Sequence, residues 1–232
     1  VLNTMMAEAL CNACDALEGA EDFDKAVEEY TAKLMREHER IVFNGNGYSE
    51  EWPVEAEKRG LPNCKSIVDA IPALVDDTTV EMYEKFNVLS KAELEAREDI
   101  LFEQYAGVRN IEALTMIEMA NKMIIPAAVK YTKKLADTVI AVKEAGADAS
   151  VQADMLSEVS GKLAEMKTAV KALEEVTAKA ADAECIKCKA EEYKDDVMAA
   201  MAELRKPADE LELIMPKELW PMPTYGDLVF EL

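Results

Sequence analysis

Few residues of this chain have the type and setting that catalysis requires. Its one histidine, His38, lies among charged residues at the end of a predicted helix. Imidazole can exchange protons near neutral pH, but no serine or cysteine can be paired with His38 by spacing. We therefore predict a surface histidine near a helix C-terminus, where the helix dipole favours a cation.

Four of the five cysteines form two Cys-x-x-Cys pairs, Cys11/Cys14 and Cys185/Cys188. Thiolates at this spacing bind zinc in many structural sites. Here both pairs lie in helical patterns and most of the chain separates them, whereas the second pair of a zinc site is usually much closer. We predict buried or incidental thiols in a reducing cytoplasm. A zinc-binding regulatory module is the alternative.

The segment 41–52 contains two successive Asn-Gly dipeptides, beginning at Asn44 and Asn46, and then Tyr48 and Trp52. Asn-Gly favours backbone with positive φ, so we predict a sharp turn. The segment matches neither a P-loop nor a dinucleotide-binding fingerprint. A structural turn between two elements is one interpretation. A surface that faces substrate or another subunit is the other.

A methionine-rich stretch surrounds the least ordinary carboxylate, Glu118. At helical spacing Glu118 can face solvent, and Met116, Met119 and Met123 are expected to fill a core. No pair of carboxylates is distinguished by an apolar setting. We therefore predict no catalytic, cofactor-binding or metal-binding residue in this chain.

Composition narrows the classes of partner. The 232 residues include 47 acidic and 26 basic side chains, for a formal charge of −21. That charge argues against nucleic-acid binding and against an anionic membrane surface. No apolar run approaches the roughly 20 residues that span a bilayer, and no signal-peptide pattern is present. Apolar residues make up 50% of the chain, which is enough for a sizeable core.

The first part of the chain is predicted to form short helices and loops. Apolar spacing indicates a helix over 1–18, ended by Gly19, and a second helix capped by Asp22. Ser49 and Ser66 are the expected N-caps of two further helices. We assign this part, residues 1–88, to the edge of a larger globular domain.

The second part, residues 89–215, is predicted to be a long-helix antiparallel bundle. A capping box at Ser90 opens a helical pattern that runs to about residue 146, with a kink expected at Pro126. Ser150 is expected to cap a second long helix, and a third runs over 184–214 with a disturbance at Pro207. Short links between long helices favour antiparallel packing. The second helix carries a nearly heptad apolar seam: Val151, Met155, Val159, Leu163, Met166, Val170, Leu173 and Ala180.

Prolines at 216, 221 and 223 predict a non-helical tail over 216–232, with Trp220, Tyr225 and Phe230 as apolar anchors. The tail is expected either to fold back on its own bundle or to contact a neighbouring subunit. The predicted fold class is therefore mainly α: short helices and loops, an antiparallel bundle and an irregular aromatic tail.

Specific strings along the chain resemble one known family. Asn-Gly-Asn-Gly-Tyr-Ser at 44–49 and Trp-Pro-Met-Pro-Thr-Tyr-Gly-Asp at 220–227 are similar to the C-terminal region of type III glutamine synthetases, a large bacterial class. Blocks at 1–10 and 109–118 extend the resemblance over essentially the whole chain. The cysteines depart from that family's pattern.

The resemblance implies an ATP-dependent ligation of ammonia to glutamate, with ATP and Mg²⁺ (or Mn²⁺), by a cytoplasmic homo-oligomer. The family's catalytic groups lie on a β-rich core that this sequence does not contain, so no catalytic residue is carried over. The resemblance implies that residues 1–88 complete the edge of the catalytic domain and that the helices pack subunits together. Alone, the chain is expected to be inactive.

Val1 enters a helical pattern without an N-cap residue before it, which favours a fragment of a longer protein. The competing hypothesis is a stand-alone helical or coiled-coil adaptor without enzymatic activity, for which the seam that begins at Val151 would be suited.

Overall fold

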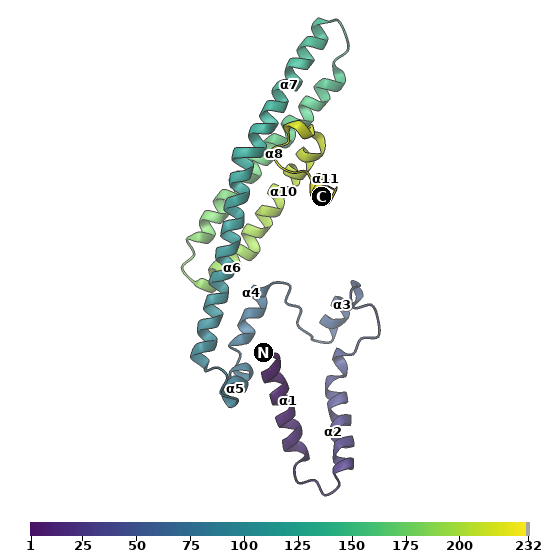
Figure 1. The fold of residues 1–232 in the computed structure, drawn as a ribbon, viewed down its shortest axis with the longest axis vertical. Helices are drawn as coiled ribbons and strands as arrows, with labels where there is room; N and C mark the ends of the chain where they lie inside the picture. Colours follow the sequence, from purple (N-terminus) through teal and green to yellow (C-terminus); the bar gives the residue numbers. More distant parts are fainter. Residues whose placement is uncertain (231–232) are drawn as a thin grey trace. The chain divides into compact units, whose positions relative to one another are not determined.

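The computed structural model describes residues 1–230 and divides into two compact units, Val1–Glu98 and the part that starts at Asp99. All regular elements of the described residues are helical, which confirms the mainly α fold class (Figure 1). Of these helices, none combines the length and the apolar character needed to cross a bilayer.

The first unit begins with two packed helices, α1 (Leu2–Leu17) and α2 (Phe23–His38). Gly19 follows α1 with φ of +80°, the left-handed conformation that glycine adopts most easily. The side chain of Asp22 accepts a hydrogen bond from the backbone N–H of Lys25 at 3.2 Å. The predicted helix end and the predicted cap are both confirmed.

Short helices complete the first unit: η1 (Glu39–Ile41), α3 (Glu51–Lys58), α4 (Ile67–Ala70), η2 (Ile71–Leu74) and α5 (Asp77–Lys85). Ser66 caps α4 as predicted, because its Oγ accepts from the N–H of Val68. The prediction for Ser49 is wrong. Its Oγ donates instead to the carbonyl of Asn46, and α3 starts without a side-chain cap.

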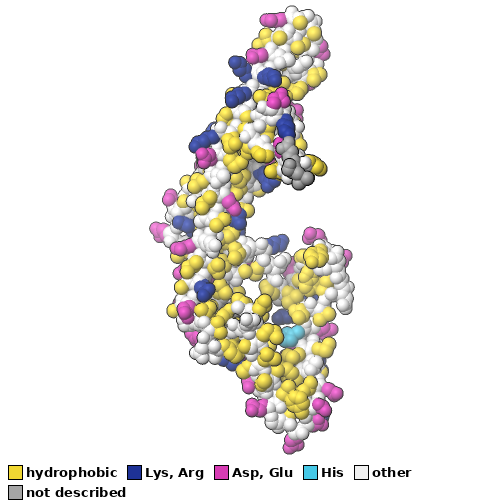
Figure 2. Space-filling view, viewed as in Figure 1, with side chains coloured by type: hydrophobic (Ala, Val, Ile, Leu, Met, Phe, Trp, Pro, Cys, Tyr) yellow, Lys and Arg dark blue, Asp and Glu magenta, His cyan; other side chains and the backbone are white. Residues whose placement is uncertain are grey.

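The first unit has a small core. Val80, Tyr83 and Leu94 form one buried cluster in it, while many large apolar side chains of α1 and α2 are exposed. Figure 2 shows hydrophobic side chains gathered on the visible surface of this unit. Burial of apolar area is the main source of folding free energy, so these faces add little stability to the unit by itself.

The long helix α6 (Lys91–Met119) starts at a capping box, as predicted. The carboxylate of Glu93 accepts from the N–H and the Oγ of Ser90, each at 2.8 Å, and Ser90 Oγ accepts from the N–H of Glu93 at 3.4 Å. These hydrogen bonds, first the one from the backbone of Ser90, lower the pKa of Glu93. The helix runs from the first unit into the second.

The disturbance predicted near Pro126 takes the form of a π-helical turn, η3 (Ala120–Ile124), directly before α7 (Ile125–Glu144). Pro126 follows as the second residue of α7, and a π-helical turn is one of the irregularities that accompany a bend in a continuous helix. As the sequence predicts, a helix, α10 (Met198–Ile214), runs through Pro207, and the disturbance expected at this proline does not interrupt it.

The helix α8 (Ser150–Ala181) packs against both α7 and α10, which gives the predicted antiparallel bundle (Figure 1). Its N-cap differs from the prediction. The side chain of Asp148 accepts from the N–H and Oγ of Ser150, at 3.0 and 2.9 Å, and so takes the role expected of Ser150. The third long element is α9 (Ile186–Glu192), the π-helical turn η4 (Tyr193–Val197) and α10.

The apolar seam of α8 is the centre of the second unit's core. Val159, Met166, Val170, Leu173 and Ala180 are buried there. The first two positions of the predicted seam, Val151 and Met155, are exposed. The other helices of the same chain therefore cover the seam from Val159 onwards.

The tail is not wholly irregular. It contains a 3₁₀ turn, η5 (Lys217–Leu219), and a short helix, α11 (Tyr225–Phe230), so the prediction of a non-helical tail is wrong over 225–230. The last two residues of the predicted tail, 231 and 232, lie outside the described residues.

Candidate functional site

The segment between α2 and α3 is organised by one arginine. Arg59, just after α3, donates from Nη1 to the carbonyl of Val42 at 2.7 Å and to that of Arg40 at 3.2 Å. Its Nε donates to Glu55 at 2.7 Å. This hydrogen bond is the main reason that the pKa of Glu55 is lowered. The guanidinium thus ties the end of α3 to the backbone that follows α2.

Two aromatic rings pack beside that arginine. The ring centroids of Phe43 and Trp52 are 4.6 Å apart, and the guanidinium carbon of Arg59 lies 6.0 Å from the Trp52 ring. An arginine over an indole gains a modest cation–π attraction. The three side chains hold the two ends of the 44–51 segment together.

The turn itself depends on Asn46. Its Oδ1 accepts from the N–H of Tyr48 at 3.0 Å, and its carbonyl accepts from the N–H of Ser49 at 3.0 Å and from Ser49 Oγ at 2.8 Å. This is the Asx-type turn that asparagine commonly stabilises. The turn expected in this segment is present.

The predicted reason for the glycines is wrong, since neither Gly45 nor Gly47 has a positive φ. Gly45 is needed for space instead: a Cβ there would lie 2.6 Å from Cζ of Phe43. Around Gly47 nothing lies within 4 Å of the same position.

The turn presents one large side chain to solvent. Tyr48 is 101% exposed, whereas Trp52 is partly covered. Beside the turn lies an open cleft of about 500 Å³, lined mainly by the acidic and basic side chains of α3, with Phe43 and Val54. An exposed phenol on a fixed turn suits recognition of another surface. The cleft offers charges but no nucleophile.

The other candidate residues lie on the surface. His38 is the exposed last residue of α2, as predicted. Glu118 faces solvent as predicted and pairs with Lys122 at 2.7 Å, and this hydrogen bond lowers its pKa. Met116 packs against the bundle core, but Met123 is 37% exposed, so the expectation of core filling is wrong for Met123.

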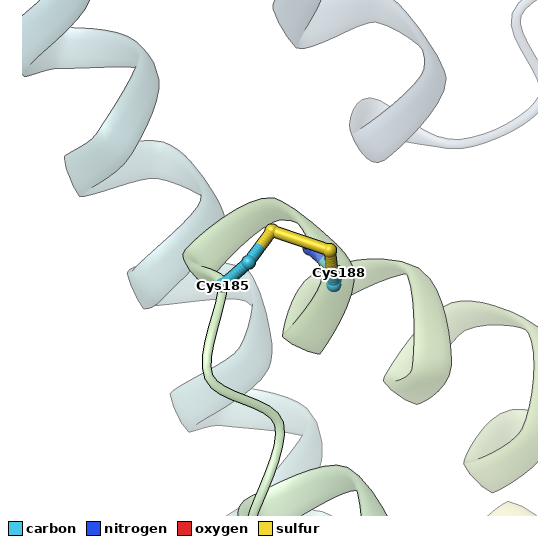
Figure 3. Close-up of a disulfide and its surroundings, with 2 residues drawn as sticks. All are labelled: Cys185 and Cys188. Atoms are coloured by element: carbon cyan, nitrogen blue, oxygen red, sulfur yellow. A yellow bond between two sulfur atoms is a disulfide. The ribbon is translucent and has the colours of Figure 1, made fainter.

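The cysteines differ from the prediction at one pair. Cys185 and Cys188 are joined by a disulfide at the start of α9 (Figure 3), so they are not incidental thiols. Cys11, Cys14 and Cys64 are unpaired thiols. Within residues 1–230, no group of three or more histidine, cysteine or acidic side chains is placed to hold a metal ion.

Sequence reasoning missed a capping box in the tail, although Thr224-x-x-Asp227 carries its signature. Asp227 accepts from the N–H of Thr224 at 2.9 Å, and Thr224 Oγ1 accepts from the N–H of Asp227 at 3.1 Å. Lys217 pairs with the same carboxylate. Together, and first through the lysine, these contacts hold the pKa of Asp227 down at about 2.

The tail docks on its own bundle. Trp220 is 7% exposed and belongs to the bundle core. Tyr225 makes hydrogen bonds to Arg205 and Asp209 of α10, and its N–H donates to Glu212 at 2.8 Å. Phe230 is exposed. Trp220 is therefore an intramolecular anchor, whereas Tyr225 and Phe230 keep exposed ring surface, at 49% and 84%.

These features describe a helical region: a bundle with a docked tail, and a smaller unit with exposed apolar helices and a fixed aromatic turn. The profile of the glutamine synthetase C-terminal domain matches residues 26–143. This chain belongs to the glutamine synthetase C-terminal domain family.

Similar proteins agree with that assignment. The chain is 34% identical over 226 residues to a glutamine synthetase of Butyrivibrio fibrisolvens. The aligned region covers 97% of this chain and 32% of that protein. It is 28% identical to the type-3 glutamine synthetase of Dictyostelium discoideum, over 99% of this chain and 32% of that protein. A glutamine synthetase of Bacteroides fragilis is 28% identical over 89% of this chain and 31% of its own length. The resemblance to type III enzymes is confirmed, and the chain spans about a third of these relatives.

Proposed function

We propose that this chain is the C-terminal part of a glutamine synthetase, where it has an architectural role: the first unit packs on the catalytic part of the subunit and the bundle contributes to packing between subunits. The proposal rests on how much of this chain and of its relatives can be aligned. Nearly the whole chain aligns with about a third of each synthetase relative.

The reaction of those enzymes joins ammonia to glutamate with ATP and a divalent cation. The described residues do not fit such a cation, because they provide no cluster of metal-binding side chains. We therefore assign this chain no step of the reaction. ATP and Mg²⁺ or Mn²⁺ would be held by the remainder of the enzyme.

The surface of the first unit supports a packing role. Leu2, Met6 and Leu10 recur at four-residue steps on α1 and are all strongly exposed. On α2, Phe23 and Met35 are exposed as well. An apolar helix face of this kind usually marks an interaction site. The catalytic part of the same subunit is the proposed occupant, and Tyr48 would contact the same neighbour.

The second unit supports the proposed subunit contacts less directly. Val151 and Met155 extend the α8 seam beyond the part that the chain itself covers, and Phe230 is exposed at the tail. A homo-oligomer in the cytoplasm, as the relatives' family suggests, would use these residues. The burial of the seam from Val159 onwards weakens the alternative of a coiled-coil adaptor, since no continuous seam is left for a partner.

Expression of the chain together with the remaining N-terminal part of the enzyme tests the proposal. We expect the two pieces to copurify, and glutamine formation from glutamate, ammonia, ATP and Mg²⁺ to require both. The isolated chain should be inactive. Turnover by the isolated chain, or failure of two folded pieces to associate, would contradict the proposed role.

A further inference from the structure

The disulfide between Cys185 and Cys188 lies at an accessible turn. Both cysteines are exposed, where the chain from α8 enters α9 (Figure 3). Cys185 is the N-cap residue, with extended backbone at φ −93° and ψ 133°. The backbone N–H of Cys188 donates to Sγ of Cys185 at 3.0 Å. A small molecule can therefore reach either sulfur without unfolding the bundle.

The chain contains a matched pair that is not bonded. Cys11 and Cys14 have the same spacing but lie inside α1, where both residues have helical backbone. Sγ of Cys11 donates to the carboxylate of Asp15 instead, at 3.9 Å. Because the spacing is the same, the extended backbone at Cys185 is what distinguishes the bonded pair.

We infer that Cys185 and Cys188 form a reversible thiol–disulfide site that exchanges with low-molecular-weight thiols and their disulfides. In the reducing direction, a thiolate attacks Sγ of Cys188, the protein S–S bond breaks, and Cys185 leaves as a thiolate. A second thiolate then attacks the mixed disulfide at the small-molecule sulfur. The products are the protein dithiol and one small-molecule disulfide, from two small-molecule thiols.

The hydrogen bond decides which sulfur leaves. A thiolate is favoured where a donor points at it, and a more stable thiolate is the better leaving group. The N–H of Cys188 points at Cys185, so Cys185 is the leaving sulfur on reduction. On oxidation it is the readily ionised thiol.

The fold around the site does not depend on the S–S bond. Ala190 and Tyr193, in the next turns, are buried in the second unit. Tyr193 also donates from its hydroxyl to the side chain of Asn110 on α6 at 2.9 Å. Packing and this hydrogen bond hold the helix start, so reduction changes the two sulfurs and leaves the bundle in place.

Glutathione redox buffers of graded composition test the inference on the full chain. After equilibration, thiols are trapped by acid and alkylation and located by peptide mass mapping. We expect Cys185 and Cys188 to convert together from two alkylated thiols to one internal disulfide across the series. Cys11, Cys14 and Cys64 should form no internal disulfide at any point of the series, and the circular dichroism should not change.

Three results would overturn the inference. The pair could stay alkylated in the most oxidising buffer, it could stay bonded in excess reduced glutathione, or it could end as two glutathione adducts. Substitution of both Cys11→Ser and Cys14→Ser is the matched control and should leave the transition unchanged.

Single variants test the assignment of the leaving sulfur. Cys188→Ser keeps the backbone N–H that points at Cys185, whereas Cys185→Ser leaves Cys188 without that donor at its sulfur. Near neutral pH, Cys185 in the first variant should be alkylated several-fold faster than Cys188 in the second. Equal rates, or the reverse order, would contradict the assigned direction of attack.

Discussion

Arg59 and Phe43 explain the conformation of the 44–51 turn better than its two Asn-Gly dipeptides do. Arg59 binds two carbonyls of the incoming chain, and Phe43 stacks on Trp52 while it covers Gly45. The turn is therefore fixed by side chains at its two ends. The backbone of the turn does not require the positive φ that glycine adopts easily.

Replacement by alanine should have different effects at the two glycines of the turn. Gly45→Ala places a methyl group against the Phe43 ring, so the ring must move and its stack on Trp52 is disturbed. We expect a loss of about 1 kcal/mol in the stability of the first unit and an altered Trp52 fluorescence. A Trp220→Phe background makes Trp52 the sole reporter.

Gly47→Ala is the matched control, because nothing surrounds that position and its φ is not positive. It should leave both the fluorescence and the melting curve close to those of the parent. Equal effects of the two alanines would mean that contact with Phe43 does not determine the turn.

Residue-level prediction from sequence succeeded where the side chain acts on its own neighbours. Asp22, Ser66 and the Ser90–Glu93 box were identified as caps because caps are local hydrogen bonds. Ser49 and Ser150 are residue types that commonly cap helices, but each hydroxyl donates to a preceding residue instead, Ser49 to the carbonyl of Asn46 and Ser150 to the carboxylate of Asp148. The choice between these hydrogen bonds depends on backbone geometry that the sequence alone does not specify.

At the scale of elements, α8 is the helix on which the second unit depends. Leu173 is fully buried in its seam, whereas Val151, at the start of the same helix, is 66% exposed. We expect Leu173→Ala to lower the free energy of unfolding by about 3 kcal/mol. Val151→Ala in the isolated chain should change it by less than about 0.5 kcal/mol. Urea denaturation of the two variants provides the comparison, and similar losses would contradict the assignment of the core.

The tail helix α11 depends on a carboxylate whose pKa is lowered. The folded pKa of Asp227 is about 2, below its ordinary value of 3.8. Its contribution to tail docking is therefore present above about pH 4 and is lost as the pH falls through about 2. Asp227→Asn should lower the stability of the docked tail at pH 7 and have no further effect near pH 2.

Fluorescence of Trp220 in a Trp52→Phe background follows this docking. The difference between the thermal transitions of the parent and of Asp227→Asn should shrink as the pH approaches 2. A difference that stays constant from pH 7 to pH 2 would show that the carboxylate charge does not hold the tail.

Element-level prediction from sequence recovered the long helices and their antiparallel order. The periodic spacing of apolar residues, the capping residues and the short links can each be recognised within a short stretch of sequence. The tail helix was missed because three prolines outweighed the Thr224–Asp227 signature. The course of the last long helix through Pro207 was predicted, although proline usually ends a helix. Pro207 is buried in the bundle, and tertiary packing of this kind can override a local helix breaker.

At the scale of the whole molecule, the two units differ in how much apolar surface they cover. The bundle buries most of its seam within the chain, whereas the first unit leaves the apolar face of α1 exposed. The candidate site could be located from the sequence, as an unusual turn, but its purpose could not. A contact between this turn and another surface cannot be read from the sequence, because it depends on residues outside the turn.

We propose that the rest of the synthetase subunit covers the exposed face of α1. Leu10 is 60% exposed on that face, so the most direct measurement compares Leu10→Asp in the isolated chain and in the complete enzyme by thermal unfolding. We expect Leu10→Asp to leave the melting temperature of the isolated chain unchanged, and to lower that of the complete enzyme markedly with loss of glutamine synthesis. The control substitution Glu28→Lys should change neither melting temperature. Equal melting shifts in the two contexts, or no shift in either, would contradict the proposal.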